Sequence, residues 1–363
     1  MLNKKLTFIL YDGITNSIFV SQVLQPILNL LKEDNNLEIT LVSFEKTKPF
    51  AQTLKELIPA HDRLHLVISR KAPFYGKSSL KLAIYQLKNL FKIIDSDEVI
   101  ARGPLAGWVA IQALKEIYKE KNYFNTFRIN KKIELKIQAR GLCAEEYRFT
   151  TQEKKENLLM KKARKFIYNQ LIDIEYQVYK KNNKFGFSKT IEAVSPALKE
   201  YITTNFNAQK SKIKLATKDI PQNINFKEKN KWRKIIRAEL NIKEDQPVYC
   251  YSGSYKPWQC IPEIIEYFCQ QYEKNSKSFL MLLSPDKKDL EKLLVNKKIP
   301  TTNYILISVK AEELFKYMAA GDIGLLFREK DIINWVSRPT KMLEYKAVGL
   351  KIMHNQTIAW LNN

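Results

Sequence analysis

The stretch KLTFILYDGITNSIFVSQVLQPILNLLKEDNNLEITLVSF, residues 5–44, contains two kinds of segment and decides the fold class. Its two ends, KLTFILY and LEITLVSF, are short apolar runs typical of buried strands. Between them, SQVLQPILNLLKE carries apolar residues at the spacing of an amphipathic helix. A strand, a helix and a strand in this order predict two parallel strands joined by a right-handed crossover.

The same alternation continues along the chain on both sides of a polar segment at residues 207–231. The first half adds strand-like runs such as RLHLVIS, EVIAR and KTIEAVS, and the second half adds PVYCYSG, SFLMLLS, YILISV and IGLLF. A chain of 363 residues is long for one hydrophobic core. We therefore expect an α/β protein with two tandem Rossmann-like domains, residues 1–210 and 211–363, and a cleft between them.

The composition, with 45% hydrophobic and 27% charged residues, is that of a globular protein. No apolar run approaches the roughly 18 residues of a transmembrane helix, so we expect a cytoplasmic location. The four cysteines include no CxxC pair, which predicts neither a zinc site nor a disulfide framework.

The formal net charge of +23 favours anionic partners. Two interpretations stay open, because the abundance of Lys, Asn and Ile would also follow from an AT-rich genome. Among anionic partners, a membrane surface is favoured over nucleic acid, since clustered basic and aromatic motifs are absent.

Parallel sheets bind ligands at the carboxyl ends of their strands, and two loops of the second half have suitable residues there. In YSGSYKPWQ, Gly253 permits close backbone approach and Lys256 offers a positive charge, although a solvated lysine is the ordinary alternative. After IGLLF, Arg328 suits a bidentate contact with phosphate, or a salt bridge with Glu329. A GxGxxG fingerprint and a P-loop are both absent.

A third loop leads into the helix predicted in SRPTKMLEYKAVG. Ser337 is a natural cap, and main-chain N–H groups near Thr340 and Lys341 would face an arriving phosphate. Glu344, one turn further along, would accept a hydrogen bond from a hydroxyl group beside that phosphate. A nucleotide has both a phosphate and hydroxyl groups. The alternative is that Glu344 is a surface glutamate on an ordinary helix.

These segments, in order, resemble the donor-binding domain of GT-B fold retaining glycosyltransferases of group 1, also called family 4. The resemblance rests on YSGSYKPWQ, ISVKAEELFKYMAAGDIGLLFRE and SRPTKMLEYKAVGLKIM, and more weakly on IARGPLAGWVAI, IQARGLCAEEY and IEAVSPALKEYI. It implies transfer of a hexose-type sugar from a nucleoside-diphosphate sugar to a surface glycan or lipid-linked acceptor, without a metal or other cofactor.

The resemblance also implies roles for individual residues. Glu344 would hold the ribose, and Lys256 and Arg328 would neutralise the diphosphate as it leaves. Ser337 to Lys341 would supply main-chain donors, and Gly253 would let its loop approach the nucleotide. No catalytic nucleophile is assigned.

The acceptor is expected to meet the first domain at Arg102, Arg140 and Glu145, beside the loop from Asp12 to Ser17. The two arginines suit a phosphorylated or acidic acceptor. For Glu145 and its neighbour Glu146, a catalytic role and a structural one both stay open. Peripheral contact with an anionic membrane would bring lipid-linked acceptors to the cleft.

Several positions depart from the family pattern. Val336 stands where many members have a glutamate, eight positions before Glu344, and Ser254 and Gln138 replace a common arginine and aspartate. The chain also ends at Asn363, earlier than the fold usually does, so we expect a truncated or shortened member. The alternatives are an inactive nucleotide-sugar-binding protein, a GT-B epimerase or phosphorylase, and a nucleic-acid-binding protein.

Two motifs look like metal sites. Asp95-Ser96-Asp97 matches the DxD of metal-dependent transferases, but it precedes a strand and so lies at the wrong end for a ligand. His61 and His65 have ligand spacing without a third ligand nearby. We therefore expect no metal site.

Overall fold

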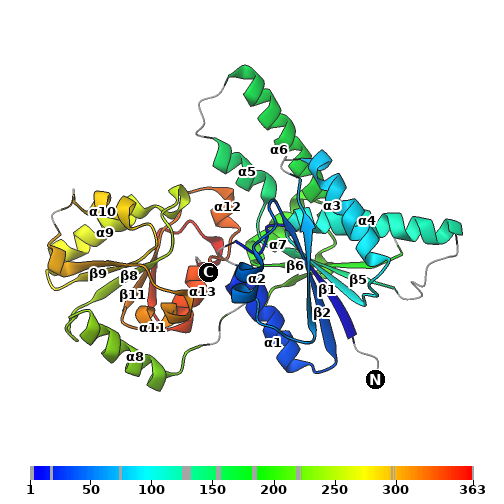
Figure 1. Ribbon diagram of the computed structural model, residues 1–363. Coiled ribbons are helices and arrows are strands. Elements are labelled where there is room, and N and C mark those ends of the chain that lie inside the picture. Colours follow the sequence, from blue (N-terminus) through cyan, green and yellow to red (C-terminus); the bar gives the residue numbers. More distant parts are fainter. Residues whose placement is uncertain are drawn as a thin grey trace. The chain divides into compact units, whose positions relative to one another are not determined.

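The chain forms two compact units, residues 1–219 and 220–363, each described here by itself. The structure is a computed structural model (Figure 1). It describes residues 4–16, 19–72, 76–124, 132–152, 157–181, 186–217, 221, 223–295, 297 and 299–361.

The first unit is built on a seven-stranded sheet in the order β3-β2-β1-β4-β5-β6-β7, with all neighbouring strands parallel. The strands are β1 (Lys4–Leu10), β2 (Leu37–Glu45), β3 (Leu64–Arg70), β4 (Glu98–Arg102), β5 (Glu134–Ala139), β6 (Ser188–Ala193) and β7 (Ile213–Leu215). The order reverses direction between β1 and β4, which is where a doubly wound sheet binds ligands.

Helices connect these strands, as the alternation in the sequence predicts. They are the π-helix η1 (Val20–Leu24), α1 (Gln25–Glu33), α2 (Ala51–Leu57), α3 (Lys77–Phe91), α4 (Gly103–Phe124), α5 (Cys143–Thr151), α6 (Leu158–Tyr179), α7 (Pro196–Asn205) and the 3-10 turn η2 (Lys210–Lys212). Two of them begin at a side-chain cap, because Asn157 accepts from the amide of Met160 and Ser195 from that of Leu198.

The second unit has a five-stranded parallel sheet in the order β10-β9-β8-β11-β12. Its strands are β8 (Val248–Ser252), β9 (Phe279–Leu283), β10 (Tyr304–Ile307), β11 (Ile323–Leu326) and β12 (Lys351–His354). Its helices are α8 (Phe226–Glu239), α9 (Ile261–Lys274), α10 (Lys287–Val295), α11 (Leu314–Met318), α12 (Ile332–Trp335) and α13 (Thr340–Ala347), with short 3-10 turns η3 (Pro257–Gln259), η4 (Thr301–Asn303), η5 (Ala311–Glu313) and η6 (Ala359–Leu361).

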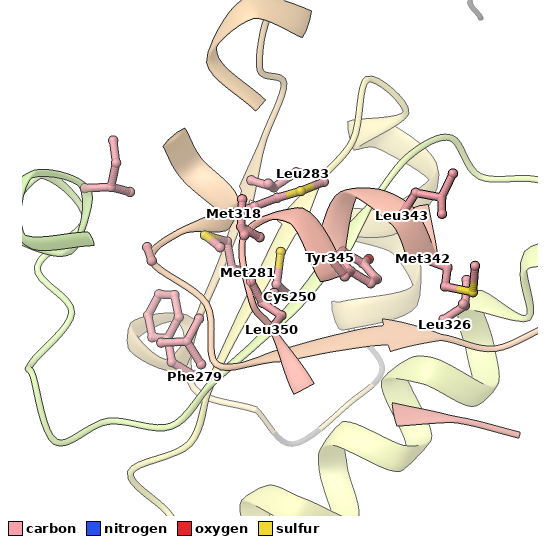
Figure 2. Packing of buried hydrophobic residues seen from close by; sticks show 14 of the residues in the cluster. Cys250, Phe279, Met281, Leu283, Met318, Leu326, Met342, Leu343, Tyr345 and Leu350 are labelled. Carbon is pink, nitrogen blue, oxygen red and sulfur yellow. The ribbon is translucent and has the colours of Figure 1, made fainter. Parts of the chain in front are cut away.

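Successive residues of β8 point to opposite faces of this sheet and enter two separate cores. Cys250 packs with Met281 and Met318 and with Tyr345 of α13 in one core (Figure 2). Tyr251 enters the other, with residues of α9 and α10. Helices therefore cover both faces of the sheet.

Two parallel sheets of seven and five strands confirm the predicted α/β architecture. The division between the units follows residue 219, later than the expected boundary at residue 210. The reason is β7, which pairs with β6 through Ile213, Lys214 and Leu215 and so extends the first sheet. The cleft between the domains stays a prediction.

Candidate functional site

The loop that follows β8 comes unusually close to the side chain of Lys341 in α13. Gly253 has a φ of +126°, and its amide donates to the carbonyl of Leu283 at 2.9 Å. A β-carbon at this position would lie 2.5 Å from Cε of Lys341. The backbone conformation therefore favours glycine here, and a β-carbon would displace the side chain of Lys341.

Lys341 is a buried cation at the carboxyl edge of the second sheet, with 8% of its surface exposed. Its Nζ donates to the hydroxyl of Tyr251 at 2.9 Å and to Oε1 of Gln259 at 2.7 Å. Burial, and then the positive charge of Arg328, hold the pKa of Lys341 well below its ordinary value, while Glu344 opposes the shift. A bound anion would offset this cost, because it favours the charged ammonium.

Arg328 lies two residues after the end of β11 and is equally buried. Asn355 fixes its backbone, since the Asn355 side chain accepts from the amide of Arg328 at 3.1 Å and donates to its carbonyl at 2.7 Å. By contrast, Nε of Arg328 is buried without a hydrogen-bond partner among the described residues. The expected alternative, a salt bridge to Glu329, is not formed in the described part of the chain, and Glu329 is exposed. One donor of this guanidinium therefore stays unsatisfied within the described part of the chain.

Glu344 lies one turn after Lys341 on α13 and is half-buried. Burial raises the pKa of its carboxyl to about 7, against the lowering effect of Lys341. The structure thus brings together four of the predicted donor-site residues, namely Gly253, Arg328, Lys341 and Glu344.

The start of α13 differs from the prediction in its cap. The helix begins at Thr340, Pro339 occupies the capping position, and no side chain makes a capping hydrogen bond. The hydroxyl of Ser337 instead donates to the carbonyl of Asn334 at 2.8 Å. The prediction that Ser337 caps this helix is therefore wrong, because the preceding short helix α12 uses its hydroxyl.

Lys256 is exposed, and its carbonyl accepts from the amide of Gln259 at 2.9 Å. The cation packed against Gly253 is thus Lys341. Three further side chains of this site were not singled out from the sequence: Tyr251, Gln259 and Asn355. Tyr251 and Gln259 stand at the two ends of the loop YSGSYKPWQ, which was the only available signal.

The first unit contains a cavity of about 920 Å³ at the carboxyl edge of its own sheet. The loops after β1 and β5 contribute Asp12 and Arg140, the start of α4 contributes Gly103, and α5 and α6 also line the cavity. Arg102, the last residue of β4, also lines the cavity and donates to the side-chain oxygen of Gln22. The two arginines predicted to meet the acceptor therefore share one cavity. Ser17, at the end of the predicted Asp12 loop, lies outside the described residues.

The two neighbouring glutamates of α5 have different environments. Glu145 accepts from Nε of Arg148 at 2.5 Å and from the hydroxyl of Tyr168 at 2.6 Å, and it is not among the cavity-lining residues. Glu146 does line the cavity, and burial followed by the charge of Asp12 raises its pKa to about 7. Glu145 is therefore paired with neighbouring side chains, and Glu146 is the one of the two that lines the cavity.

A second acid lies behind the cavity wall. Glu175 of α6 is 2% exposed and accepts from the main-chain amides of Cys143 and Ala144 at the start of α5. Burial raises its pKa to about 8, although these hydrogen bonds act in the opposite direction. Glu175 thus links α6 to the first turn of α5.

The apparent metal motifs have local structural roles. Asp97 accepts from the amide of Lys5 at 2.8 Å, Ser96 hydrogen-bonds Thr7 at 2.6 Å, and Nδ1 of His61 accepts from the amide of Arg63 at 3.1 Å. Within the described residues, no group of three or more His, Cys, Asp or Glu side chains is arranged to hold a metal ion. No described helix combines the length and hydrophobicity needed to cross a membrane.

Comparison with known proteins identifies the fold. No family model and no curated protein matches the sequence. Among solved structures, the chain is similar to sucrose-phosphate synthase from Thermosynechococcus elongatus, with a TM-score of 0.63, 13% identity, and coverage of 98% of this chain and 82% of that one. A glycosyltransferase from Rickettsia africae has a TM-score of 0.61 and 11% identity, with coverage of 100% of this chain and 82% of that one. WaaG, a glycosyltransferase involved in lipopolysaccharide biosynthesis, has a TM-score of 0.59 and 14% identity, with coverage of 98% of this chain and 82% of that one. At these identities the likeness establishes the GT-B fold.

Proposed function

We propose that the protein is a glycosyltransferase whose second unit binds a nucleoside-diphosphate sugar. The observation that carries the proposal is the buried pair of cations, Lys341 and Arg328, with the Glu344 carboxyl next to them at the carboxyl edge of a parallel sheet. Two buried cations and one acceptor fit a ligand with a diphosphate and free hydroxyl groups.

In this proposal, Arg328 and Lys341 bind oxygens of the diphosphate, and Glu344 accepts hydrogen bonds from the ribose hydroxyls. Charge on the diphosphate increases as the bond to the sugar breaks, and fixed cations in a water-poor site stabilise that charge. These cations would take the place of a metal ion. Retention of the anomeric configuration of the donor is part of the proposal because the resemblance in the sequence implies it. Lys256, on the exposed part of the loop after β8, contributes a weaker long-range attraction for the diphosphate.

The acceptor binds in the cavity of the first unit. Arg102 and Arg140 suit a phosphate or another acidic group, and the apolar part of the lining, including Ile167 and Leu171, suits a hydrocarbon or a sugar face. A lipid-linked or surface glycan with an anionic group has both features. Such an acceptor also gives a reason for peripheral membrane contact.

A nucleotide-sugar-binding protein without turnover is the second candidate. Val336 occupies the position of a family glutamate and is 1% exposed, so its side chain is buried and offers no carboxylate to a donor. Binding is common to both candidates, and consumption of the donor separates them.

The test is incubation with a panel of radiolabelled UDP- and GDP-sugars, with and without EDTA, in the presence of anionic glycan and lipid-linked acceptors. We expect transfer or slow hydrolysis of one donor, unaffected by EDTA and lost in Lys341→Met. Anomeric NMR of the product would test retention. Donor binding without any consumption would support the second candidate, and the absence of binding would contradict both.

A further inference from the structure

The first three turns of α6 expose an unusual number of large apolar side chains. Leu158, Leu159, Met160 and Phe166 are 70%, 76%, 56% and 64% exposed. Asn157 caps the helix, so these side chains belong to a regular element. Exposed apolar residues gathered in this way indicate a binding surface more than isolated ones do.

Basic residues lie among these apolar ones. The segment from residue 157 to 172 contains Lys161, Lys162, Arg164 and Lys165 and no acidic residue. No ion pair is found for the three lysines among the described residues. Lys162 and Phe166 are four positions apart, so they share one face of the helix. A helix surface with both long basic chains and exposed apolar groups is typical of elements that lie in a membrane interface.

The opposite face of the same helix lines the cavity of the first unit. Met160, Ala163, Arg164, Ile167 and Leu171 contribute to that lining at helical spacing. Figure 1 shows that the N-terminal end of α6 extends away from the sheet of its unit, with α5 beside the helix. The helix that lines the cavity on one face therefore presents Leu158, Leu159, Phe166 and its lysines on the other.

We propose that the N-terminal half of α6, residues 158–166, binds the surface of an anionic phospholipid bilayer. Leu158, Leu159 and Phe166 enter the boundary between headgroups and acyl chains, and the lysines contact the headgroup phosphates while their stems follow the apolar surface. Nucleic acid would interact with the lysines through its phosphates but would not bury the exposed apolar side chains. A bilayer interacts with both, so it is the favoured partner.

This surface extends the proposed function, because a lipid-linked acceptor held in the bilayer would reach the cavity along α6. Its assay nevertheless needs no substrate. Binding to vesicles is measured on the whole protein without donor or acceptor, and donor binding is measured separately without vesicles. Absence of vesicle binding would leave the donor-binding result unchanged, and absence of donor binding would leave the vesicle result unchanged.

The experiment is cosedimentation with vesicles of phosphatidylcholine, with or without phosphatidylglycerol, at low and high salt. We expect binding to the anionic vesicles, weakened about tenfold or more in the double variant Leu159→Gln/Phe166→Gln and in the triple variant Lys161→Gln/Lys162→Gln/Lys165→Gln. Phe226→Gln is the matched control, since Phe226 is 78% exposed on α8 of the second unit. Thermal unfolding of each variant should match that of the wild type, because all these side chains are exposed.

Three results would overturn the proposal. One is absence of binding to anionic vesicles, and another is equal binding by the wild type and both α6 variants. The third is competition by RNA that removes vesicle binding, with only the lysine variant impaired, which would identify a general polyanion surface.

Discussion

Lys341 fills the space beside Gly253: a β-carbon on that glycine would lie 2.5 Å from Cε and 2.7 Å from Nζ of the lysine. Gly253 lies in the loop after β8 and Lys341 in the first turn of α13, both at the carboxyl edge of the second sheet. Because glycine has no β-carbon, the basic side chain of Lys341 is held in a buried position against this loop.

Gly253→Ala should displace Lys341 and strain the backbone. A side chain at φ +126° costs about 1–3 kcal/mol, and the contact with Lys341 must also be relieved. Gly103→Ala is the matched control, because Gly103 also has a positive φ, of +80°, but nothing lies within 4 Å of its β-carbon. Urea unfolding measures the strain, and titration with nucleotide sugar measures the site. Equal donor affinity in the wild type and Gly253→Ala would contradict the assigned role of Lys341.

Lys341→Met should weaken donor binding about 10- to 100-fold, since a charge-assisted hydrogen bond contributes about 1.5–3 kcal/mol. Stability should change by less than about 1 kcal/mol, because two hydrogen bonds are lost while the desolvation of a buried charge is relieved. Lys256→Met provides the comparison and should have a smaller effect, because Lys256 is exposed. Calorimetric titration of the wild type and the two variants measures their three donor affinities. A larger loss in Lys256→Met would move the diphosphate to the exposed part of the loop.

Donor affinity should show a bell-shaped dependence on pH. The Glu344 carboxyl has a pKa raised to about 7 and accepts ribose hydroxyls best when ionised, so affinity falls as the pH drops below about 7. The pKa of Lys341 is lowered, so its positive charge is lost as the pH rises. Glu344→Gln should remove the acidic limb and Lys341→Met the alkaline one. UDP- or GDP-sugars serve as ligands, since they have no terminal phosphate that titrates near neutrality. An acidic limb that persists in Glu344→Gln would assign it to another group.

The stability of the first unit should decrease as the pH rises from about 4.5 to 8. The pKa of Glu175 is raised from 4.5 to about 8, so the folded state binds a proton that the unfolded state has already released in this range. The contribution of Glu175 to the free energy of unfolding is therefore fully present below pH 4.5. It is lost as the pH rises through about 8. Glu175→Gln keeps an acceptor for the amides of α5 and should flatten the profile of urea midpoints. An unchanged profile in that variant would assign the effect to other acids, such as Glu146.

The positions of strands and helices along the chain were accessible from the sequence where periodicity is strong. The run FLMLL of β9 and the helix α9 are examples, because a buried parallel strand is apolar throughout and a covering helix is amphipathic. Helix α8 was missed, since FKEKNKWRKIIRAE is mostly charged. What holds it is Arg237, 1% exposed, which donates to Asp322 and to the carbonyl of Ala320. Hydrophobic periodicity gives no indication of such a buried charged contact.

The candidate site was accessible in part. Gly253, Arg328 and Glu344 follow from their places after strands or near a helix start, which the chain order alone provides. The burial of Lys341 and the exposure of Lys256 were not accessible, because they depend on how α13 packs against the β8 loop. The choice between Glu145 and Glu146 likewise depends on Arg148 and Tyr168, which pair with the first of them.

The most direct test of the central claim is calorimetric titration of the wild type and Arg328→Met with a panel of UDP- and GDP-sugars. Nε of Arg328 is buried without a partner among the described residues, so a diphosphate should provide the missing contact. We expect saturable binding of one nucleotide class to the wild type and at least about tenfold weaker binding to the variant. Absence of binding with every nucleotide sugar, or equal affinity in the two proteins, would contradict the account.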